Sequence, residues 1–393
     1  MSNAIVRFAH RAAGRIPHPV ADRLLPGRRR AIAQGGTTRV ERAATRLFIG
    51  PVNSAGQGYA WARAAERLPG VAAADFMYRN PGDVFAFPAD HAVPTPFFIS
   101  SAPWQRAQRR AVAKRFTHVI VESGRHLFGS DGRVLDQVEF LRRAGVRVAL
   151  LWHGSDIRLP SRHAASDPDS PFLHDRYPET DRLEEIAQRN RALIAESGLP
   201  VFVSTPDLLE HVPGASWLPV VVDVDGWADA ATEPALERRR PVVVHAPSNA
   251  GLKGSDLIAD TVRRLEAEGI IEYREVRGVA AEQMPAVYGT ADIVLDQFAL
   301  GIYGVAACEA LAAGRVVVSH VAEFTRETVR ERTELELPIV EARADGLEVV
   351  LRDVVAERER YRAVAATGPA FVRAVHDGRR SAQALGAFLG VSV

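Results

Sequence analysis

Short apolar segments alternate with helical segments along most of this 393-residue chain. Apolar runs lie at 45–52, 117–123 and 146–154, and segments with helical spacing separate them. Strands that are apolar along almost their whole length and are separated by helices are typical of a parallel sheet covered on both faces. The sequence therefore predicts an α/β fold.

The same alternation starts again in the second half of the chain. Its predicted strands are 238–248, 270–279, 292–298 and 315–321. Residues 215–240 mix Pro, Asp and Arg and break the periodicity, so we interpret them as an interdomain segment. We expect two Rossmann-like parallel-sheet domains, at 46–222 and 223–372, that face each other across a cleft. We assign 373–393 to a C-terminal helix.

Composition excludes several classes of protein. The net charge of +1 provides no global field for nucleic acid, so we expect no nucleic-acid partner. Cys308 is the only cysteine, which leaves no intrachain disulfide. The sequence contains no run of 18 apolar residues, so it predicts no membrane span. The first residues lack the apolar core of a secretory signal. We therefore expect a cytoplasmic protein.

Charge is concentrated at the start of the chain. Residues 1–46 contain ten arginines but only two acids, a net charge of +8, and we treat 1–45 as a basic N-terminal extension. The extension is either a solvated, partly disordered segment or a peripheral contact with anionic lipid, at the inner face of the membrane, or with a polyanionic acceptor. Apolar residues between the arginines predict an amphipathic helix at 4–14.

Two common nucleotide-binding motifs are absent. Gly56 and Gly58 follow the first strand, but Trp61 stands where the dinucleotide-binding fingerprint needs a small residue. Leu252 separates Gly251 from Lys253, whereas a P-loop needs adjacent Gly and Lys. The sequence therefore predicts neither a dehydrogenase nor an NTPase.

Two loops of the second domain nevertheless favour an anionic ligand. Lys253 precedes a predicted helix at 254–269, and it is one of only two lysines in a chain that otherwise uses arginine. Backbone N–H groups at a helix N-terminus favour anions, so Lys253 could complete a phosphate site; alternatively, its side chain points to solvent. Glu309 lies among small apolar residues after Gly301 and Gly304, and it either binds ribose hydroxyls or is a structural carboxylate.

The first domain contributes a polar cluster at the end of a strand. His153 and Asp156 follow the apolar run at 146–154, with Arg158 close behind. We interpret them as cleft residues, although a histidine at a strand end can also be a supporting hydrogen-bonding group. The acidic pair Asp223 and Asp225 lies in the interdomain segment, and no histidines show metal-ligand spacing, so we expect no metal.

The segments at 245–258, 274–298 and 301–319 together resemble the nucleotide-sugar domain of GT-B glycosyltransferases, with the retaining, metal-independent family four as the closest branch. The first domain agrees through "NSAGQG" at 53–58 and "LLWHGSDIR" at 150–158. The resemblance covers roughly residues 46–390, and it implies that the C-terminal helix at 373–393 crosses back to the first domain. It implies transfer of a sugar, with retention, from a nucleotide-diphospho-sugar to a hydroxyl of a glycan, lipid-linked or small-molecule acceptor. The donor is a co-substrate, and no cofactor is expected.

The resemblance also implies roles for individual residues. Lys253 would contact the diphosphate, the backbone at 302–305 would donate amides to it, and Glu309 would accept the ribose hydroxyls, while His153 would lie by the transferred sugar. The candidate donor-binding residues are Gly56, Gln57, Gly58, Ser248, Asn249, Lys253, Gly254, Gly278, Val279, Gly301, Ile302, Tyr303, Gly304, Val305 and Glu309. The candidate catalytic residues are His153, Asp156, Lys253 and Glu309.

Two positions depart from the family's pattern. The family usually has a second glutamate eight residues before Glu309, where this chain has Gly301, and an arginine near Pro247 or Ser248. Ser248 and Asn249 can donate neutral hydrogen bonds instead. These departures leave two alternatives open: a non-catalytic subunit that binds nucleotide sugar, and a sugar-nucleotide epimerase on the same fold.

Overall fold

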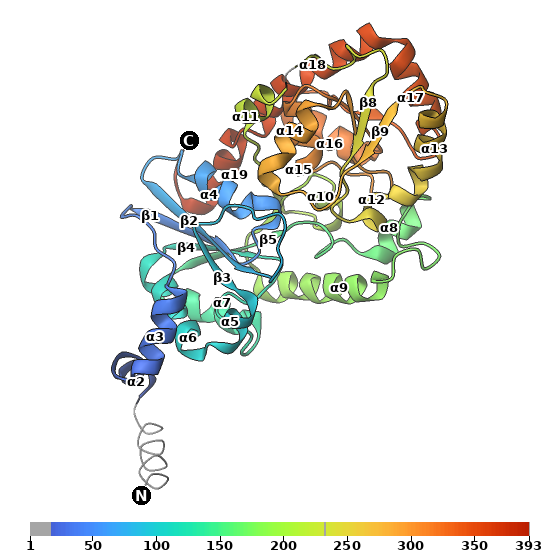
Figure 1. The fold of residues 1–393 in the computed structure, drawn as a ribbon. Coiled ribbons are helices and arrows are strands. Elements are labelled where there is room, and N and C mark those ends of the chain that lie inside the picture. The colour runs from blue at the N-terminus through green and yellow to red at the C-terminus, as the bar shows by residue number, and fades with distance from the viewer. Residues whose placement is uncertain (1–16, 232, 393) are drawn as a thin grey trace, which may run out of the picture.

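The computed structural model describes residues 17–231 and 233–392, and it contains two parallel sheets (Figure 1). The first sheet has seven strands in the order β3-β2-β1-β4-β5-β6-β7, and every neighbouring pair is parallel. Its strands are β1 (Thr45–Gly50), β2 (Val71–Arg79), β3 (His91–Pro94), β4 (His118–Glu122), β5 (Arg147–Trp152), β6 (Val201–Val203) and β7 (Ser216–Trp217). The structure confirms the three predicted strands of this domain, which are β1, β4 and β5. They lie next to one another in the middle of the sheet, and most of their side chains are buried.

The second sheet has five parallel strands in the order β12-β11-β10-β8-β9. They are β8 (Val242–His245), β9 (Glu272–Glu275), β10 (Ile293–Leu295), β11 (Val316–Ser319) and β12 (Val340–Glu341). The predicted α/β fold with two parallel-sheet units is therefore confirmed. β12 was not predicted, because two edge residues give no apolar run.

Helices cover both sheets (Figure 1). Those of the first domain are α4 (Gln57–Ala65), α5 (Thr95–Ser100), α6 (Ala102–Arg115), α7 (Val134–Arg143), α8 (Pro160–Ser166), α9 (Thr180–Ser197) and α10 (Leu208–His211), with a 3-10 turn η1 at Ser54–Gly56. Those of the second part are α11 (Val224–Asp229), α12 (Ala250–Lys253), α13 (Ser255–Ala267), α14 (Met284–Gly289), α15 (Val305–Ala312), α16 (Glu323–Thr333), α17 (Leu347–Ala356), α18 (Arg358–Val375) and α19 (Arg379–Leu389), with η2 at Ala281–Gln283. α13 begins directly after Gly254, close to the start of the predicted helix at 254–269. Gly254 itself has φ of +70°.

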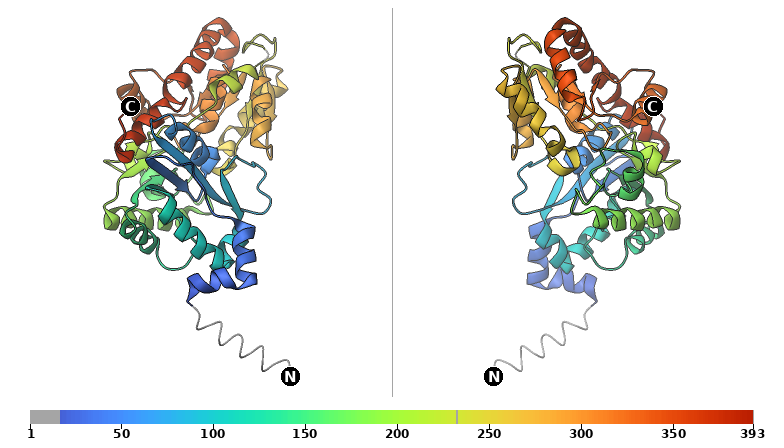
Figure 2. Two further views of the ribbon diagram at one scale, coloured as in Figure 1. Left: turned by 90° about the vertical axis from the view of Figure 1, so that its left-hand side faces the viewer. Right: turned by 90° about the vertical axis from the view of Figure 1, so that its right-hand side faces the viewer.

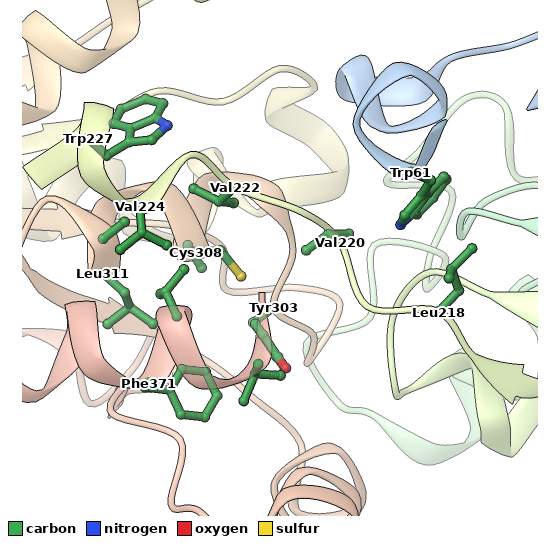
Figure 3. Packing of buried hydrophobic residues seen from close by; sticks show 14 of the residues in the cluster. Trp61, Leu218, Val220, Val222, Val224, Trp227, Tyr303, Cys308, Leu311 and Phe371 are labelled. Atoms are coloured by element: carbon green, nitrogen blue, oxygen red, sulfur yellow. The ribbon is translucent and has the colours of Figure 1, made fainter. Parts of the chain in front are cut away.

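The linker between the domains is itself a buried apolar segment (Figure 3). Leu218 and Val220 lie toward Trp61 of α4, whereas Val222 and Val224 lie toward α15 and α18. The indole N–H of Trp61 donates to the carbonyl of Pro219 at 2.8 Å. The bulky residue that rules out the dinucleotide fingerprint therefore holds the linker against the first domain.

The last two helices connect the domains a second time (Figure 2). α18 packs against α15 of the second domain, and α19 packs against α4 of the first. Between them, Gly378 has φ of +94°, and a Cβ there would lie 3.3 Å from the Ala64 Cβ. The C-terminal segment thus crosses back to the first domain, as the resemblance implies.

Residues 17–44 pack on the first domain and do not form a separate extension. α2 (His18–Leu24) and α3 (Pro26–Gly35) form a helical pair, and α3 packs against α6. The buried carboxylate of Asp22 binds Arg106 at 2.9 Å and Arg110 at 3.0 Å, both on α6. Residues 17–44 therefore belong to the surface of the first domain, and the predicted helix at 4–14 lies outside the described residues.

Candidate active site

Lys253 and Asp296 lie together at the carboxyl end of the second sheet. Lys253 ends α12, in the loop after β8, and Asp296 directly follows β10. The Lys253 ammonium forms an ion pair with the Asp296 carboxylate. Asp296 is a buried residue, with 4% of its surface exposed. Since parallel strands place their carboxyl ends at one edge, this is where ligands bind in open α/β sheets. Asp296 fixes the ammonium at that edge.

Glu309 is held close to this pair without a partner of its own. In the described part of the chain, no group donates a hydrogen bond to its carboxylate. Burial raises the pKa of Glu309 to about 8, with the charge of Asp296 adding to the rise and the charge of Lys253 opposing it. A carboxyl with free acceptor capacity next to a fixed ammonium is suited to bind a hydroxyl-bearing, phosphorylated ligand.

The turn before α15 presents backbone amides to the same region. Among the described residues, the N–H groups of Tyr303, Gly304 and Val305 have no hydrogen-bond acceptor. A Cβ on Gly304 would meet no atom within 4 Å, so this turn is open. The Tyr303 side chain is buried instead, and its hydroxyl lies 3.2 Å from His376 Nε2. Ile302 uses its carbonyl to accept from the Gln297 amide.

Gly301 has a structural reason to be glycine. Its φ is +63°, and a Cβ would lie 3.1 Å from the Ala322 Cβ and 3.4 Å from His320 Nε2. A side chain here would be strained and crowded. At the position where the family usually has a glutamate, the backbone conformation and the neighbouring atoms of this chain therefore favour glycine.

In the first domain, His153 is oriented by a buried acid that the sequence analysis missed. His153 Nε2 lies 3.1 Å from Glu122 Oε1, and its ring stacks on Trp61 with centroids 5.7 Å apart. Burial lowers the pKa of His153, but the hydrogen bond and charge of Glu122, together with Asp156, outweigh burial and raise it. Glu122 Oε2 also accepts the N–H groups of Val52 and Asn53 at 2.8 and 2.9 Å. The sequence did contain a signal for Glu122, because it is an acidic residue at the end of the apolar run at 117–123.

Asp156 organises the loop that carries His153. Its carboxylate accepts the backbone N–H groups of His153 and Gly154 at 3.0 and 2.8 Å, and the hydroxyl of Ser123 at 2.7 Å. These three donors occupy both oxygens. Asp156 thus holds the loop that carries His153, and its predicted catalytic role stays a prediction.

The glycine-rich loop after β1 contacts the linker through Gln57 and is closely packed at its two glycines. Gln57 is committed to the linker, because its side chain accepts from the Val221 N–H at 2.7 Å and donates to the Val221 carbonyl at 3.1 Å. The side-chain amide of Gln57 is therefore used within the protein, and its predicted contact with the donor stays a prediction. Gly56 has φ of +73°, and a Cβ there would lie 3.0 Å from Phe87, while one on Gly58 would lie 3.2 Å from Asn53 Oδ1. Both glycines serve close packing of the loop.

The remaining predicted residues lie in two loops of the second domain. Ser248 is exposed. The Asn249 amide is used, since its oxygen caps α12 through the Leu252 N–H at 3.1 Å and its nitrogen donates to the Tyr177 hydroxyl at 3.0 Å. Asn249 therefore does not offer the free donor that we expected. Gly254 turns the chain between α12 and α13, and Gly278 and Val279 form a loop after β9, with Gly278 exposed and Val279 half-buried.

A second feature that the sequence analysis missed joins the domains near Gly301. We call Asp167, His320, Glu341 and Arg343 the interdomain clasp. Asp167, which follows α8, lies 3.1 Å from His320 Nε2 and 3.1 Å from Arg343 Nη1, and Glu341 lies 2.7 Å from His320 Nδ1. Burial lowers the pKa of His320, but Asp167 and Glu341 outweigh burial and raise it to about 9. The hydrogen bonds and charge of His320 and Arg343 overcome burial and hold the pKa of Asp167 well below its usual range.

The loops at the carboxyl ends of the two sheets therefore face each other. Besides the clasp, His163 Nε2 of α8 lies 3.2 Å from the Leu300 carbonyl, and the Ala281 N–H donates to the Phe85 carbonyl at 3.1 Å. The described residues contain no group of three His, Cys, Asp or Glu side chains arranged for a metal ion. Among the described helices, none has the length and hydropathy of a membrane-spanning segment.

The fold of this chain is similar to that of solved glycosyltransferases. Sucrose-phosphate synthase from Thermosynechococcus elongatus is 14% identical, with a TM-score of 0.56 over 88% of this chain and 98% of its own. HepE from Anabaena, in complex with UDP and glucose, is 13% identical, with a TM-score of 0.54 over 88% and 99%. This chain has the GT-B fold. A glycosyltransferase from Rickettsia africae is 10% identical, with a TM-score of 0.55 over 88% and 98%. No family model matches the sequence, and no curated protein is similar to it.

Replacing Glu309 with glutamine tests the unpartnered carboxyl. A raised pKa means that the folded protein loses stability as pH rises from the ordinary value of 4.5 through about 8. We expect Glu309→Gln to match the wild type at pH 4 and to exceed its stability at pH 9 by at least about 1.4 kcal/mol, the free energy of one pKa unit. Thermal denaturation at both pH values measures this. A loss of stability at every pH would instead indicate a structural carboxylate.

Proposed function

We propose that this chain transfers a glycosyl group from a nucleotide-diphospho-sugar to an acceptor hydroxyl. One observation carries the proposal: Lys253, Glu309 and the free amides that precede α15 converge at the carboxyl end of the second sheet. An ammonium and oriented N–H groups fit a diphosphate, and an acceptor without a partner fits ribose hydroxyls. HepE, a solved structure with the same fold, is described with UDP-glucose bound.

The chemical step follows from this placement. The bond between the anomeric carbon and the diphosphate oxygen breaks, and the acceptor oxygen bonds to that carbon. The nucleoside diphosphate leaves and takes the acceptor proton. Lys253 and the amides stabilise the charge that develops on the leaving group, without requiring a metal. His153, held by Glu122 and Trp61, contacts the sugar from the first domain.

Retention of the anomeric configuration is part of the proposal. Attack from the face that the diphosphate leaves would allow the diphosphate itself to act as the base. The resemblance to retaining GT-B enzymes supports this outcome. Closure of the domains through the clasp would exclude water from the reacting centre.

The proposed setting is synthesis of a glycan, cell-surface polysaccharide or glycoconjugate in the cytoplasm. Residues 1–46 would contact an anionic membrane, which fits a lipid-linked acceptor. Their net charge of +8 supports this contact, as do Val20 and Leu24 of α2, whose exposed fractions are 44% and 65%. Sedimentation with anionic and with neutral vesicles measures the contact.

A donor screen tests the donor site. UDP-, GDP-, ADP- and dTDP-sugars are added separately, and the melting temperature is measured. We expect one nucleotide series to raise the melting temperature, because a ligand that binds only the folded state stabilises it. The Glu309→Gln variant should show a smaller rise with that same series. If no series raises the melting temperature or binds in calorimetry, the proposed donor site is wrong.

A further inference from the structure

A hollow of about 860 Å³ at the N-terminal edge of the first sheet is strongly cationic. Its lining consists of Arg39, Val40, Glu41, Arg42, Ala43, Arg46, Lys114 and Arg115. Five of these eight residues are cations and only Glu41 is an acid. We call this the basic pocket. It includes Lys114, the only lysine besides Lys253.

The basic pocket has a fixed floor and free cations around it. Arg46 donates to the carbonyl of Arg115, and the Arg115 guanidinium donates to the carbonyl of Thr38 at 2.7 Å. These acceptors are neutral carbonyl groups, so neither contact pairs a guanidinium with a negative charge. Arg39, Arg42 and Lys114 form no ion pair with any residue that the structure describes.

The accumulated charge is not neutralised by nearby acids. α6, which supplies Lys114 and Arg115, has no acidic residue, and the one acid among the described residues that pairs with α6, Asp22, binds Arg106 and Arg110 rather than the residues of the pocket. Burial lowers the pKa of Arg115, and the like charge of Arg39 lowers it further. Residues 1–16, which lie outside the described structure, contain no Asp or Glu that could pair with the pocket. Mutual repulsion of this kind is relieved by a bound anion.

The basic pocket is separate from the candidate active site. It lies where β1 begins, at Thr45, whereas the loop facing the second domain follows the other end of β1, at Gly50. A six-residue strand separates the two by roughly 17 Å. An anion in the basic pocket therefore cannot be the donor diphosphate.

We propose that the basic pocket binds a phosphate group of a second ligand, either the headgroup of an anionic lipid or a soluble phosphate ester. Guanidinium groups bind phosphate oxygens in pairs, and a lysine adds a compact charge, so this set suits phosphate better than a single carboxylate. The inference deepens the proposed membrane contact by naming where a headgroup would bind, and it does not depend on glycosyl transfer.

The test uses the full chain and a triple variant, Arg39→Ser, Arg42→Ser and Lys114→Ser. The matched control, Arg67→Ser, Arg189→Ser and Arg332→Ser, removes the same charge from exposed arginines without ion pairs to described residues. Binding is measured with vesicles containing phosphatidylglycerol, with neutral phosphatidylcholine vesicles, and with inorganic pyrophosphate in solution.

We expect the pocket variant to lose at least 10-fold in binding to the anionic vesicles or to pyrophosphate, and the control to lose less than 3-fold. Loss confined to vesicles identifies a lipid headgroup, and loss with pyrophosphate identifies a soluble phosphate. Equal losses in the two variants, or no binding of either probe by the wild type, would overturn the proposal. Binding of the nucleotide found in the donor screen should be unchanged in the pocket variant, which separates this result from a failure of the donor site.

Discussion

Replacement of Lys253 by alanine is expected to weaken binding of the donor nucleoside diphosphate by about 10- to 150-fold, because a hydrogen bond to a charged group contributes roughly 1.5–3 kcal/mol. The substitution also leaves the buried carboxylate of Asp296 without its cation, so its charge then opposes a diphosphate. Isothermal titration calorimetry with the nucleotide selected by the donor screen measures the change.

The chain provides its own control for this substitution. Lys114→Ala removes the only other lysine, which is exposed at the C-terminal end of α6, and should leave the same affinity within about 2-fold. An unchanged affinity in Lys253→Ala would remove Lys253 from the phosphate site. Equal losses in both variants would point to a general effect of charge.

Replacement of Asp167 by asparagine is expected to open the clasp. Removing one partner of a buried ion pair costs about 3–5 kcal/mol. We expect a smaller loss here, because His320 keeps its ion pair with Glu341 and Arg343 keeps its ion pair with Asp169. We expect a melting temperature lower by several degrees and at least a 10-fold fall in kcat. Affinity for the nucleotide should change less than kcat, since its proposed contacts lie in the second domain.

The clasp also predicts a pH dependence. The raised pKa of His320 means that its contribution is complete below its ordinary value of 6.5 and is lost as pH rises through about 9. The wild type should therefore lose stability between these values, whereas Asp167→Asn should show a flatter profile. Asp181→Asn, at an exposed position in the first turn of α9, is the matched control and should behave as the wild type. A clasp variant with unchanged melting temperature and kcat would show that the contact is dispensable.

The architecture could be predicted because strands and helix starts depend on residues that are close together in the sequence. The apolar strands at 45–52 and 146–154 and the glycine at 254 each act on their own neighbours, so alternation and helix starts could be inferred directly. Lys253 was recognisable for a similar reason, since it stands out in composition and next to a helix start.

Partners distant in sequence could not be predicted in this way. The Gln57 amide is used by Val221, and the Asn249 amide by Tyr177, each from another part of the chain. Nothing near Asp167 in the sequence indicates that His320 lies against it. The left-handed backbone at Gly301, crowded by Ala322, is likewise a property of the packed structure.

The central claim is that Lys253 and Glu309 handle the donor of a glycosyl transfer. The most direct measurement follows release of nucleoside diphosphate from the nucleotide sugar that the donor screen selects, with a panel of glycan, lipid-linked and small-molecule acceptors. We predict acceptor-dependent release that falls at least 10-fold in Lys253→Ala and persists in Arg67→Ala, which removes an exposed cation outside both proposed sites. Tight donor binding without release or hydrolysis would indicate a non-catalytic binding subunit, and interconversion of the donor without acceptor would indicate an epimerase; either result would contradict glycosyl transfer.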